Sequence, residues 1–467
     1  MTNGPRGMPA PPPREEDDAD SHVRFVYAAL LFATVGGFAL AVWLPVQAAL
    51  GHVGLSWVAL AQVHGHLQVI GFAGLFVLGV ATKLAPRFGG GHLVRPRLVD
   101  AAFWCAVAGL LARALGQPLA TQMPFAALMM AGALLELTGT ALFATSIALT
   151  LWPSIVRGAP HALLMTAGMV WLVVQALLGA IWLGQIAGGD TNVLRHDRDI
   201  LLVTLQFYGF LLCVFSGVGL RSFPSFFGMP QPSLRLGRAA FVLLQGGLLL
   251  WLGGGLLMTL GVEAGRPTDA GQVLVGAAIL ALVSAFGWWR RETRLAVASQ
   301  PLAWPLRATL VMLTLTGLLL GTTGVDAFVR DEVVLTVRAD AVRHVFALGV
   351  ITLGIVTMAQ LILPEFASER LVHPPKKWRG VALGSLLVAA VVLRGFVPLS
   401  GVDATVRSWS MAGGGGLGLT AVAAFGVLFH RARRTHVAYL KRVAAWRTRA
   451  LPTTDDSPPA RRDAPPL

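Results

Sequence analysis

The chain has 467 residues, of which 55% are hydrophobic and 13% charged, and its mean hydropathy is +0.68. A soluble globular chain carries about 25% charged residues, so this composition excludes an ordinary soluble protein. The net charge of +14 would suggest nucleic-acid binding in a soluble chain. Here the basic residues cluster in particular connections between apolar segments, so membrane topology explains the charge and no nucleic-acid partner is expected.

Residues 1–23 are rich in proline and acidic residues and are predicted to be a disordered cytoplasmic segment. The remainder predicts an all-α, polytopic membrane protein, because twelve apolar segments each approach the roughly 20 residues that a spanning helix needs. The first segment follows an acidic stretch, so we interpret it as a retained helix and not as a cleaved signal peptide. The segments cover residues 24–48, 56–85, 98–116, 124–152, 161–187, 199–223, 237–262, 270–290, 302–324, 341–363, 378–397 and 407–430.

Lysine and arginine gather after the second, sixth, eighth and tenth segments and in the C-terminal tail, residues 431–467. The connections after the first and third segments carry neither residue. The positive-inside rule then predicts that both termini are cytoplasmic. We therefore expect a multi-pass protein of the inner (cytoplasmic) membrane. Its domains would be the N-terminal segment, a transmembrane domain over residues 24–430, and a tail that is basic and then proline-rich.

One sequence pattern occurs three times. His66, Gly71, Pro86 and Phe88 in the second segment match His344, Gly349, Pro364 and Phe366 in the tenth, and the sixth segment has Thr204, Gly209, Pro224 and Phe226. The three prolines lie 138 and then 140 residues apart. Glycine and proline are frequent in membrane helices, so chance recurrence is the alternative. The shared spacing favours three pseudo-repeats of four helices.

Two histidines occupy the same position of this pattern. With a cytoplasmic N-terminus, His66 and His344 would both lie in the outer half of the membrane and point toward a shared interior. His64 is two residues from His66, about 200° round the helix, so we expect it to have a different role. The alternative is that each imidazole only hydrogen-bonds a neighbouring helix.

Two arginines form a second correspondence, because Arg113 and Arg394 each lie four or five residues before a proline near the predicted outer face. Paired imidazoles and guanidiniums suit a haem whose iron is bound by two histidines and whose propionates pair with arginine. We therefore predict haem b bound by His66 and His344, with Arg113 and Arg394 at its propionates. The alternative for the arginines is snorkelling to the membrane interface. His64 is a further candidate ligand, for instance for copper.

Three other polar residues lie within predicted spans. Glu136 is a candidate proton carrier or a structural carboxyl, and Gln68 and Gln206 occupy equivalent positions that we expect to bridge helices. Cys105 and Cys213 form neither a CxxC nor a CxxCH motif, so the sequence predicts neither a disulfide framework nor covalent haem attachment.

The segment His64–Gly79, HGHLQVIGFAGLFVLG, and the Arg343–His344 pair resemble the NnrS family. The twelve helices and the histidines in helices 2 and 10 more distantly resemble subunit I of haem–copper oxidases and nitric oxide reductases. The chain departs from the NnrS pattern at Leu67, where that pattern has an acid. It also lacks the oxidase copper ligands: helix 6 has Thr204, helix 7 has no histidine, and helix 10 has only His344.

The resemblance implies a haem-containing membrane protein that acts in nitric oxide metabolism or resistance to nitrosative stress. Its expected partners are the lipid bilayer, haem, and nitric oxide or a small redox donor. Two alternatives remain open from the sequence. One is a twelve-helix membrane transporter, and the other is an oxidase-like electron-transfer subunit without the usual copper ligands.

Overall fold

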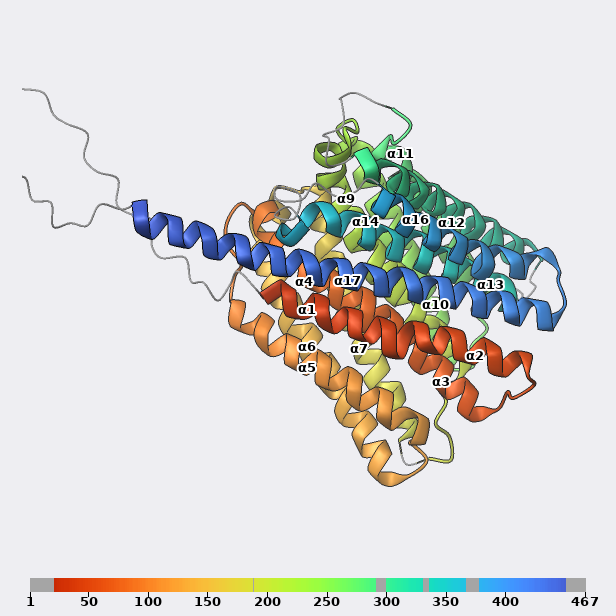
Figure 1. The fold of residues 1–467 in the computed structure, drawn as a ribbon. Helices are drawn as coiled ribbons and strands as arrows, with labels where there is room; N and C mark the ends of the chain where they lie inside the picture. The colour runs from red at the N-terminus through yellow and green to blue at the C-terminus, as the bar shows by residue number, and fades with distance from the viewer. Residues whose placement is uncertain (1–20, 188, 291–299, 331–335, 367–377, 451–467) are drawn as a thin grey trace, which may run out of the picture.

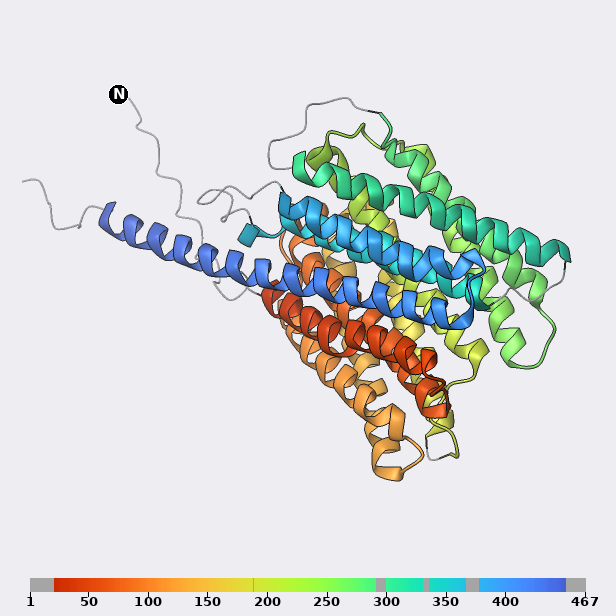
Figure 2. The same ribbon diagram turned by 45° about the vertical axis from the view of Figure 1, so that its right-hand side comes forward.

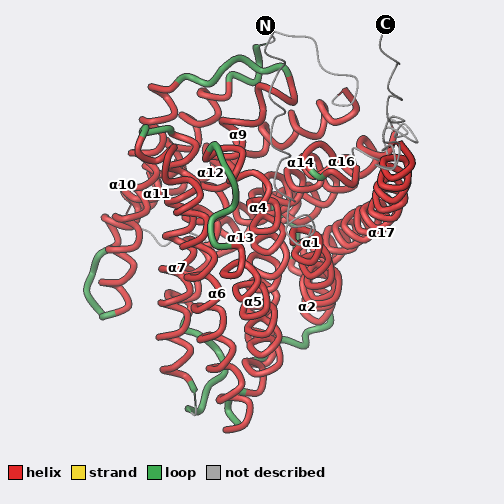
Figure 3. The backbone as a smooth tube through the Cα atoms, turned by 90° about the vertical axis from the view of Figure 1, so that its left-hand side faces the viewer, coloured by secondary structure: helices red, strands yellow, loops and turns green. Residues whose placement is uncertain are grey.

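The computed structural model describes residues 21–187, 189–290, 300–330, 336–366 and 378–450. Helices and the turns between them make up this part of the chain, and Figure 3 shows no strand within it. Twelve helices in these ranges are long and apolar enough to cross a membrane, which confirms the predicted number and the all-α class. The expected disorder of residues 1–20 and 451–467 lies outside the described residues.

Within the described residues the helices follow the predicted segments closely, except at the C-terminal end of the last one. The first four spans consist of α1 (Ser21–Leu31), η2 (Phe32–Phe38), α2 (Ala39–Ala49), α3 (Leu55–His66), η3 (Leu67–Gly74), α4 (Leu75–Gly89), α5 (Pro96–Gly116), η4 (Gln117–Leu119) and α6 (Met123–Val156). The next four consist of α7 (Pro160–Ile186), α8 (His196–Thr204), η5 (Leu205–Leu211), α9 (Leu212–Phe227), α10 (Leu234–Thr259) and α11 (Gly265–Phe286). The last four consist of η6 (Gln300–Leu302), α12 (Ala303–Arg330), α13 (Thr336–His344), η7 (Val345–Thr352), α14 (Leu353–Ile362), α16 (Trp378–Val391), η8 (Val392–Phe396), η9 (Val397–Ser400) and α17 (Ala404–Ala450).

The last helix is longer than its apolar sequence suggests. The hydrophobic pattern ends near residue 430, but α17 continues through the basic residues to Ala450 and extends beyond the rest of the bundle (Figures 1 and 2). The basic segment after residue 430 is therefore helical as far as Ala450. Lysine and arginine are good helix formers, which explains why the helix does not stop where the apolar residues stop.

Helices 2, 6 and 10 form the centre of the bundle. They are 78%, 83% and 78% buried along their most apolar stretch, whereas no other span exceeds 56%. Each contains a π-helical segment, and the three segments η3, η5 and η7 contact one another. These segments begin directly after His66, Thr204 and His344, the three equivalent positions of the sequence pattern. π-Helical turns are rare in α-helices, and those that occur often lie at functional sites. The shared position therefore makes these three residues candidates for a functional site.

The equivalent glycines allow each central helix to approach the outer helix that precedes it. A Cβ atom at Gly71, Gly209 or Gly349 would lie 3.1, 2.9 or 2.8 Å from its nearest neighbour, which belongs in turn to Phe32, Trp171 or Met312. These neighbours come from helices 1, 5 and 9. A larger residue at any of the three glycines would therefore push a central helix away from its outer partner.

The outer helices pack around this centre in a closed arrangement. α6 packs against α7, α11 against α12, and α17 against α2, so the last span lies beside the first (Figure 1). The beginning of α1 and the end of α17 lie at the same end of the bundle. Large apolar side chains face outward, among them Trp104, Leu115 and Val242, which are 64%, 63% and 66% exposed. Such an apolar exterior is typical of a lipid-facing surface.

A buried ion pair joins helices 1 and 10 at the end where the chain enters α1. His22 Nε2 lies 3.0 Å from Glu365 Oε1, with side chains 1% and 0% exposed, and Arg433 of α17 lies 3.6 Å from the same oxygen. Burial alone would raise the pKa of the Glu365 carboxyl, but the hydrogen bond and the attraction of His22 outweigh it. The pKa of Glu365 therefore lies below its ordinary value of 4.5.

This depressed pKa predicts acid sensitivity. Glu365 binds protons more weakly in the folded state, so its contribution to stability is present above pH 4.5 and is lost as the pH falls through the folded pKa. The thermal unfolding midpoint of the detergent-solubilised protein should therefore fall below that pH. Glu365→Gln should be less stable at neutral pH and lose less on acidification, whereas Glu263→Gln at an exposed position should follow the wild type. Parallel pH profiles for wild type and Glu365→Gln would contradict this assignment.

Candidate functional site

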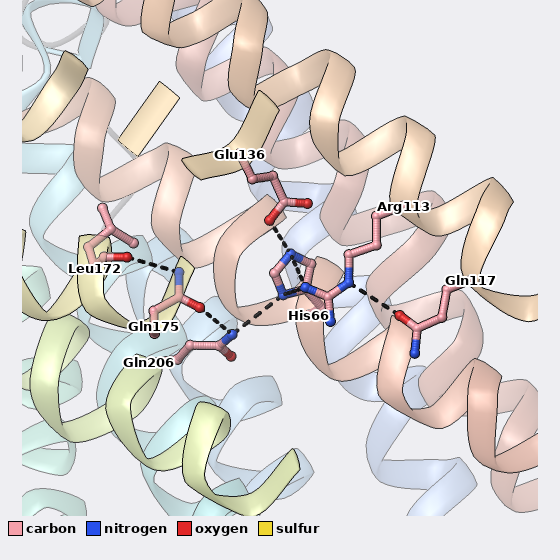
Figure 4. Close-up of polar contacts among 7 residues, drawn as sticks. All are labelled: His66, Arg113, Gln117, Glu136, Leu172, Gln175 and Gln206. Atoms are coloured by element: carbon pink, nitrogen blue, oxygen red, sulfur yellow. Dashed lines mark hydrogen bonds and ion pairs between the residues drawn. The ribbon is translucent and has the colours of Figure 1, made fainter. Parts of the chain in front are cut away.

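His66 is the last residue of α3 and lies deep in the bundle. Its Nε2 is 2.6 Å from Oε2 of Glu136, which comes from the middle of α6 (Figure 4). The two side chains are 4% and 7% exposed. Since a carboxylate only accepts hydrogen bonds, the imidazole donates from Nε2 and leaves Nδ1 as an acceptor. The proton shared in this short contact can lie on His66 Nε2 or on Glu136 Oε2.

Arg113 of α5 places a buried cation next to this pair. Its Nη1 lies 3.1 Å from Nδ1 and 3.2 Å from Nε2 of His66, and its Nε donates to Gln117 Oε1 at 3.2 Å. Arg113 is 6% exposed, so it does not snorkel to the surface. With a neutral imidazole, the guanidinium and the Glu136 carboxylate balance each other in charge. This balance explains how three ionisable side chains are accommodated inside a membrane bundle.

Hydrogen bonds extend this group on both sides. On one side Gln117 donates to Gln62 at 3.0 Å, and Gln62 pairs with the main chain of Leu194, in the connection before helix 6. On the other side Gln206 donates to Gln175 Oε1 at 3.0 Å, and its Nε2 lies 3.4 Å from His66 Nδ1. The expectation that Gln206 bridges helices is therefore confirmed, whereas the buried Oε1 of Gln68, for which the same was expected, has no hydrogen-bond partner among the described residues. A polar chain, meaning the series of hydrogen bonds from Leu194 to Glu136, therefore runs from a loop at one end of the bundle into its interior.

A second polar group lies around His344, the last residue of α13. Asp340, one turn earlier in the same helix, accepts from Arg394 at 2.6 and 3.4 Å, and its carboxylate lies 3.3 Å from His344 Nδ1. His64 lies close enough to interact electrostatically with His344, Arg394 and Asp340. Of the two histidines of α3, His64 and not His66 is thus the one within electrostatic range of the histidine of helix 10, although no hydrogen bond or ion pair joins His64 to His344 among the described residues.

His64 and His344 share one hydrogen-bonding arrangement. Nδ1 of His64 is 2.8 Å from the carbonyl oxygen of Gly37, and Nδ1 of His344 is 2.8 Å from that of Asp340. A carbonyl oxygen only accepts, so in both rings Nδ1 carries the proton and Nε2 carries a lone pair. Neither Nε2 has a hydrogen-bond partner among the described residues. Metal-bound histidines characteristically use one nitrogen in this way to orient the ring.

The predicted site residues therefore separate into two groups. His66 and Arg113 lie together, and His344 and Arg394 lie together, so each repeated histidine is near the repeated arginine of the following span. The expectation that His64 and His66 point to different surroundings agrees with the structure. His66 and His344 were expected to point toward a shared space inside the bundle. In the structure His66 bonds to Glu136 and Arg113, whereas His344 bonds to Asp340. Both arginines already pair with side chains of the protein.

The sequence pattern did not single out two acidic partners, Asp340, which is 36% exposed, and Glu365, which is buried. Asp340 precedes His344 by four residues, which places both on one helix face and was a usable signal. Glu365 lies between the proline and the phenylalanine of the third repeat copy, but its partner His22 is 343 residues away. No sequence spacing points to a contact of that kind.

The described residues contain no group of three or more histidine, cysteine, aspartate or glutamate side chains that could hold a metal ion. Comparison of the sequence with protein-family models gives no match, and neither does comparison with curated proteins.

Proposed function

We propose that this chain is a haem-binding integral membrane protein of NnrS type, acting in nitric oxide metabolism or resistance to nitrosative stress. One observation carries the haem assignment. His64 and His344 each direct Nδ1–H to a main-chain carbonyl and leave Nε2 without a hydrogen-bond partner among the described residues. The nitric oxide role rests on the family resemblance of the His64–Gly79 segment.

Haem fits this donor set better than a bare metal ion does. Zinc or copper bound only by protein side chains generally needs three or four ligands, and the described residues offer no such group. A haem iron already has four porphyrin nitrogens and needs only two axial ligands. The pair His64 and His344 would meet that need, so we propose these two residues as the haem ligands in place of the pair His66 and His344.

The surrounding main-chain and side-chain groups would orient the imidazole rings of His64 and His344. The carbonyl groups of Gly37 and Asp340 fix the tautomer and rotation of the two rings, and the Arg394–Asp340 pair packs beside His344. When bound, the haem would supply one-electron transfer. Arg113 and Arg394 already bond to side chains of the protein, so we do not assign either of them to the haem propionates.

We further propose three pseudo-repeats of four helices and cytoplasmic termini in the inner membrane. The shared position of the three π-helical segments and the matched packing of three glycines support the repeat. The basic connections support the orientation.

The transporter alternative is favoured by the polar chain from Leu194 to Glu136, which could conduct a polar solute or proton part of the way. Beyond it a small apolar cavity of about 70 Å³ lies between the central helices, and its lining includes Phe76, Leu211, Phe215 and Met358. A polar route through the centre is thus interrupted by apolar side chains, and this favours the haem proposal. An oxidase-like electron-transfer subunit without copper would use the same two histidines.

The direct test is the cofactor content of protein purified from haem-replete cells. We expect about one haem per chain with a low-spin b-type spectrum, since two histidines form a strong ligand field. The haem should extract into acidic acetone, because the chain has no CxxCH motif for covalent attachment. Copper should be absent from the same preparation. A colourless, folded preparation would exclude the proposal.

A further inference from the structure

A cavity lies beside Thr204, the residue of helix 6 that occupies the repeat position of His66 and His344. Its volume is about 330 Å³, and residues of helices 6 to 10 line it. Pockets for small molecules typically begin at about 300 Å³. The two histidine groups do not line it, so it is separate from the proposed haem site. Arg343, which lines it, directly precedes His344 in the chain.

Three buried hydroxyl groups line this cavity without hydrogen-bond partners among the described residues. They belong to Thr204, Tyr208 and Thr323, whose side chains are 4%, 3% and 2% exposed. The Thr323 hydroxyl is fully enclosed and unpaired. Buried hydroxyls nearly always find a partner, and leaving one unsatisfied costs free energy. A ligand with hydrogen-bonding oxygens would satisfy them.

The remaining wall is aromatic and apolar. Trp251 and Tyr208 stack with ring centroids 5.9 Å apart and planes inclined by 24°, and Phe207, Met258 and Leu320 complete this side. Flat rings of this kind provide a surface on which another planar ring packs well. The shape and chemistry of the wall therefore favour a planar, lipid-soluble compound.

The charges at the cavity are largely balanced. Arg343 lies within electrostatic range of Asp199, although no ion pair or hydrogen bond joins their side chains among the described residues, and the Asp197 carboxylate is paired with Arg195 at 2.8 Å. A strongly anionic or cationic ligand would disturb both balances, whereas a neutral ligand would leave them intact. The guanidinium of Arg343 can still donate a hydrogen bond to a neutral oxygen.

We propose that this cavity binds a neutral, lipid-soluble ring compound bearing carbonyl or hydroxyl oxygens, of the quinone and quinol class. The ring packs against Trp251 and Phe207, and its oxygens accept hydrogen bonds from Tyr208, Thr323 and Arg343. This inference goes beyond the proposed function and does not depend on it, because the cavity residues differ from the histidines that would bind haem.

The test is equilibrium binding of duroquinone to the full-length, detergent-solubilised protein, measured by isothermal titration calorimetry. Durene, the same tetramethylated ring without oxygens, serves as the control ligand. We expect saturable binding of duroquinone and at least tenfold weaker binding of durene. Tyr208→Phe and Thr323→Val should each weaken duroquinone binding by roughly 3- to 10-fold, the equivalent of one hydrogen bond.

The chain offers a matched control in the adjacent residue. Thr322 lies on the same helix but is exposed, and its hydroxyl already donates to Leu318 at 2.8 Å. Thr322→Val should therefore bind duroquinone like the wild type. The proposal is overturned if folded protein shows no saturable binding, if durene binds as tightly as duroquinone, or if the Tyr208→Phe, Thr323→Val double variant keeps wild-type affinity.

Discussion

Replacing Glu136 by leucine should lower the free energy of unfolding by about 3–5 kcal/mol, the typical cost of removing one partner from a buried ion pair. Glu136 is 5% exposed, bonds His66 at 2.6 Å and balances the charge of Arg113. Without it, the Arg113 guanidinium would remain buried beside a neutral imidazole and the Gln117 amide. The change should be measured by denaturant unfolding of the detergent-solubilised protein.

Two variants distinguish a charge effect from a packing effect. The double variant Glu136→Leu, Arg113→Met removes both charges, so it should recover much of the stability that the single variant loses. Asp100→Leu is the surface control, because Asp100 pairs with Arg24 while 52% exposed and should contribute at most about 1 kcal/mol. A double variant less stable than Glu136→Leu would show that the charges of Glu136 and Arg113 do not balance each other.

Replacing either His64 or His344 by alanine should abolish the low-spin haem spectrum, whereas His66→Ala should retain it. The reason is the hydrogen bonding, since His64 and His344 each keep an unbonded Nε2 while both ring nitrogens of His66 face side-chain partners. The sequence alone predicts a different order, in which His66 and His344 are the pair and His64→Ala is the milder change. Optical spectra and haem content of the three purified variants decide between the two assignments.

Folding must be checked in the same preparations, because His66 also belongs to the buried group with Glu136. An unchanged α-helical circular dichroism spectrum would show that a lost haem signal reflects lost ligation. Loss of low-spin character in His66→Ala, together with a wild-type spectrum in His64→Ala, would restore the pairing predicted from the sequence. Wild-type spectra in all three variants would exclude both pairings.

The membrane architecture could be predicted from the sequence because it depends on local properties. Each span needs a minimum run of apolar residues, and all twelve predicted segments correspond to helices of the structure. The pattern around Gly71, Gly209 and Gly349 also identified helices 2, 6 and 10 as special, and these three helices form the buried centre. The bridging role of Gln206 followed from the cost of leaving an amide unpaired within the membrane.

The partners of the ionisable residues were decided only by the tertiary structure. Helix geometry separates His64 and His66 by about 200°, so the sequence could predict that they diverge, but not which face meets helix 10. That choice depends on how α3 is rotated against helices 1, 3, 4 and 10. Glu136 meets His66 across 70 residues of chain, and Arg394 meets Asp340 across 54. Contacts over such separations arise from the packing of whole helices, which no local pattern encodes.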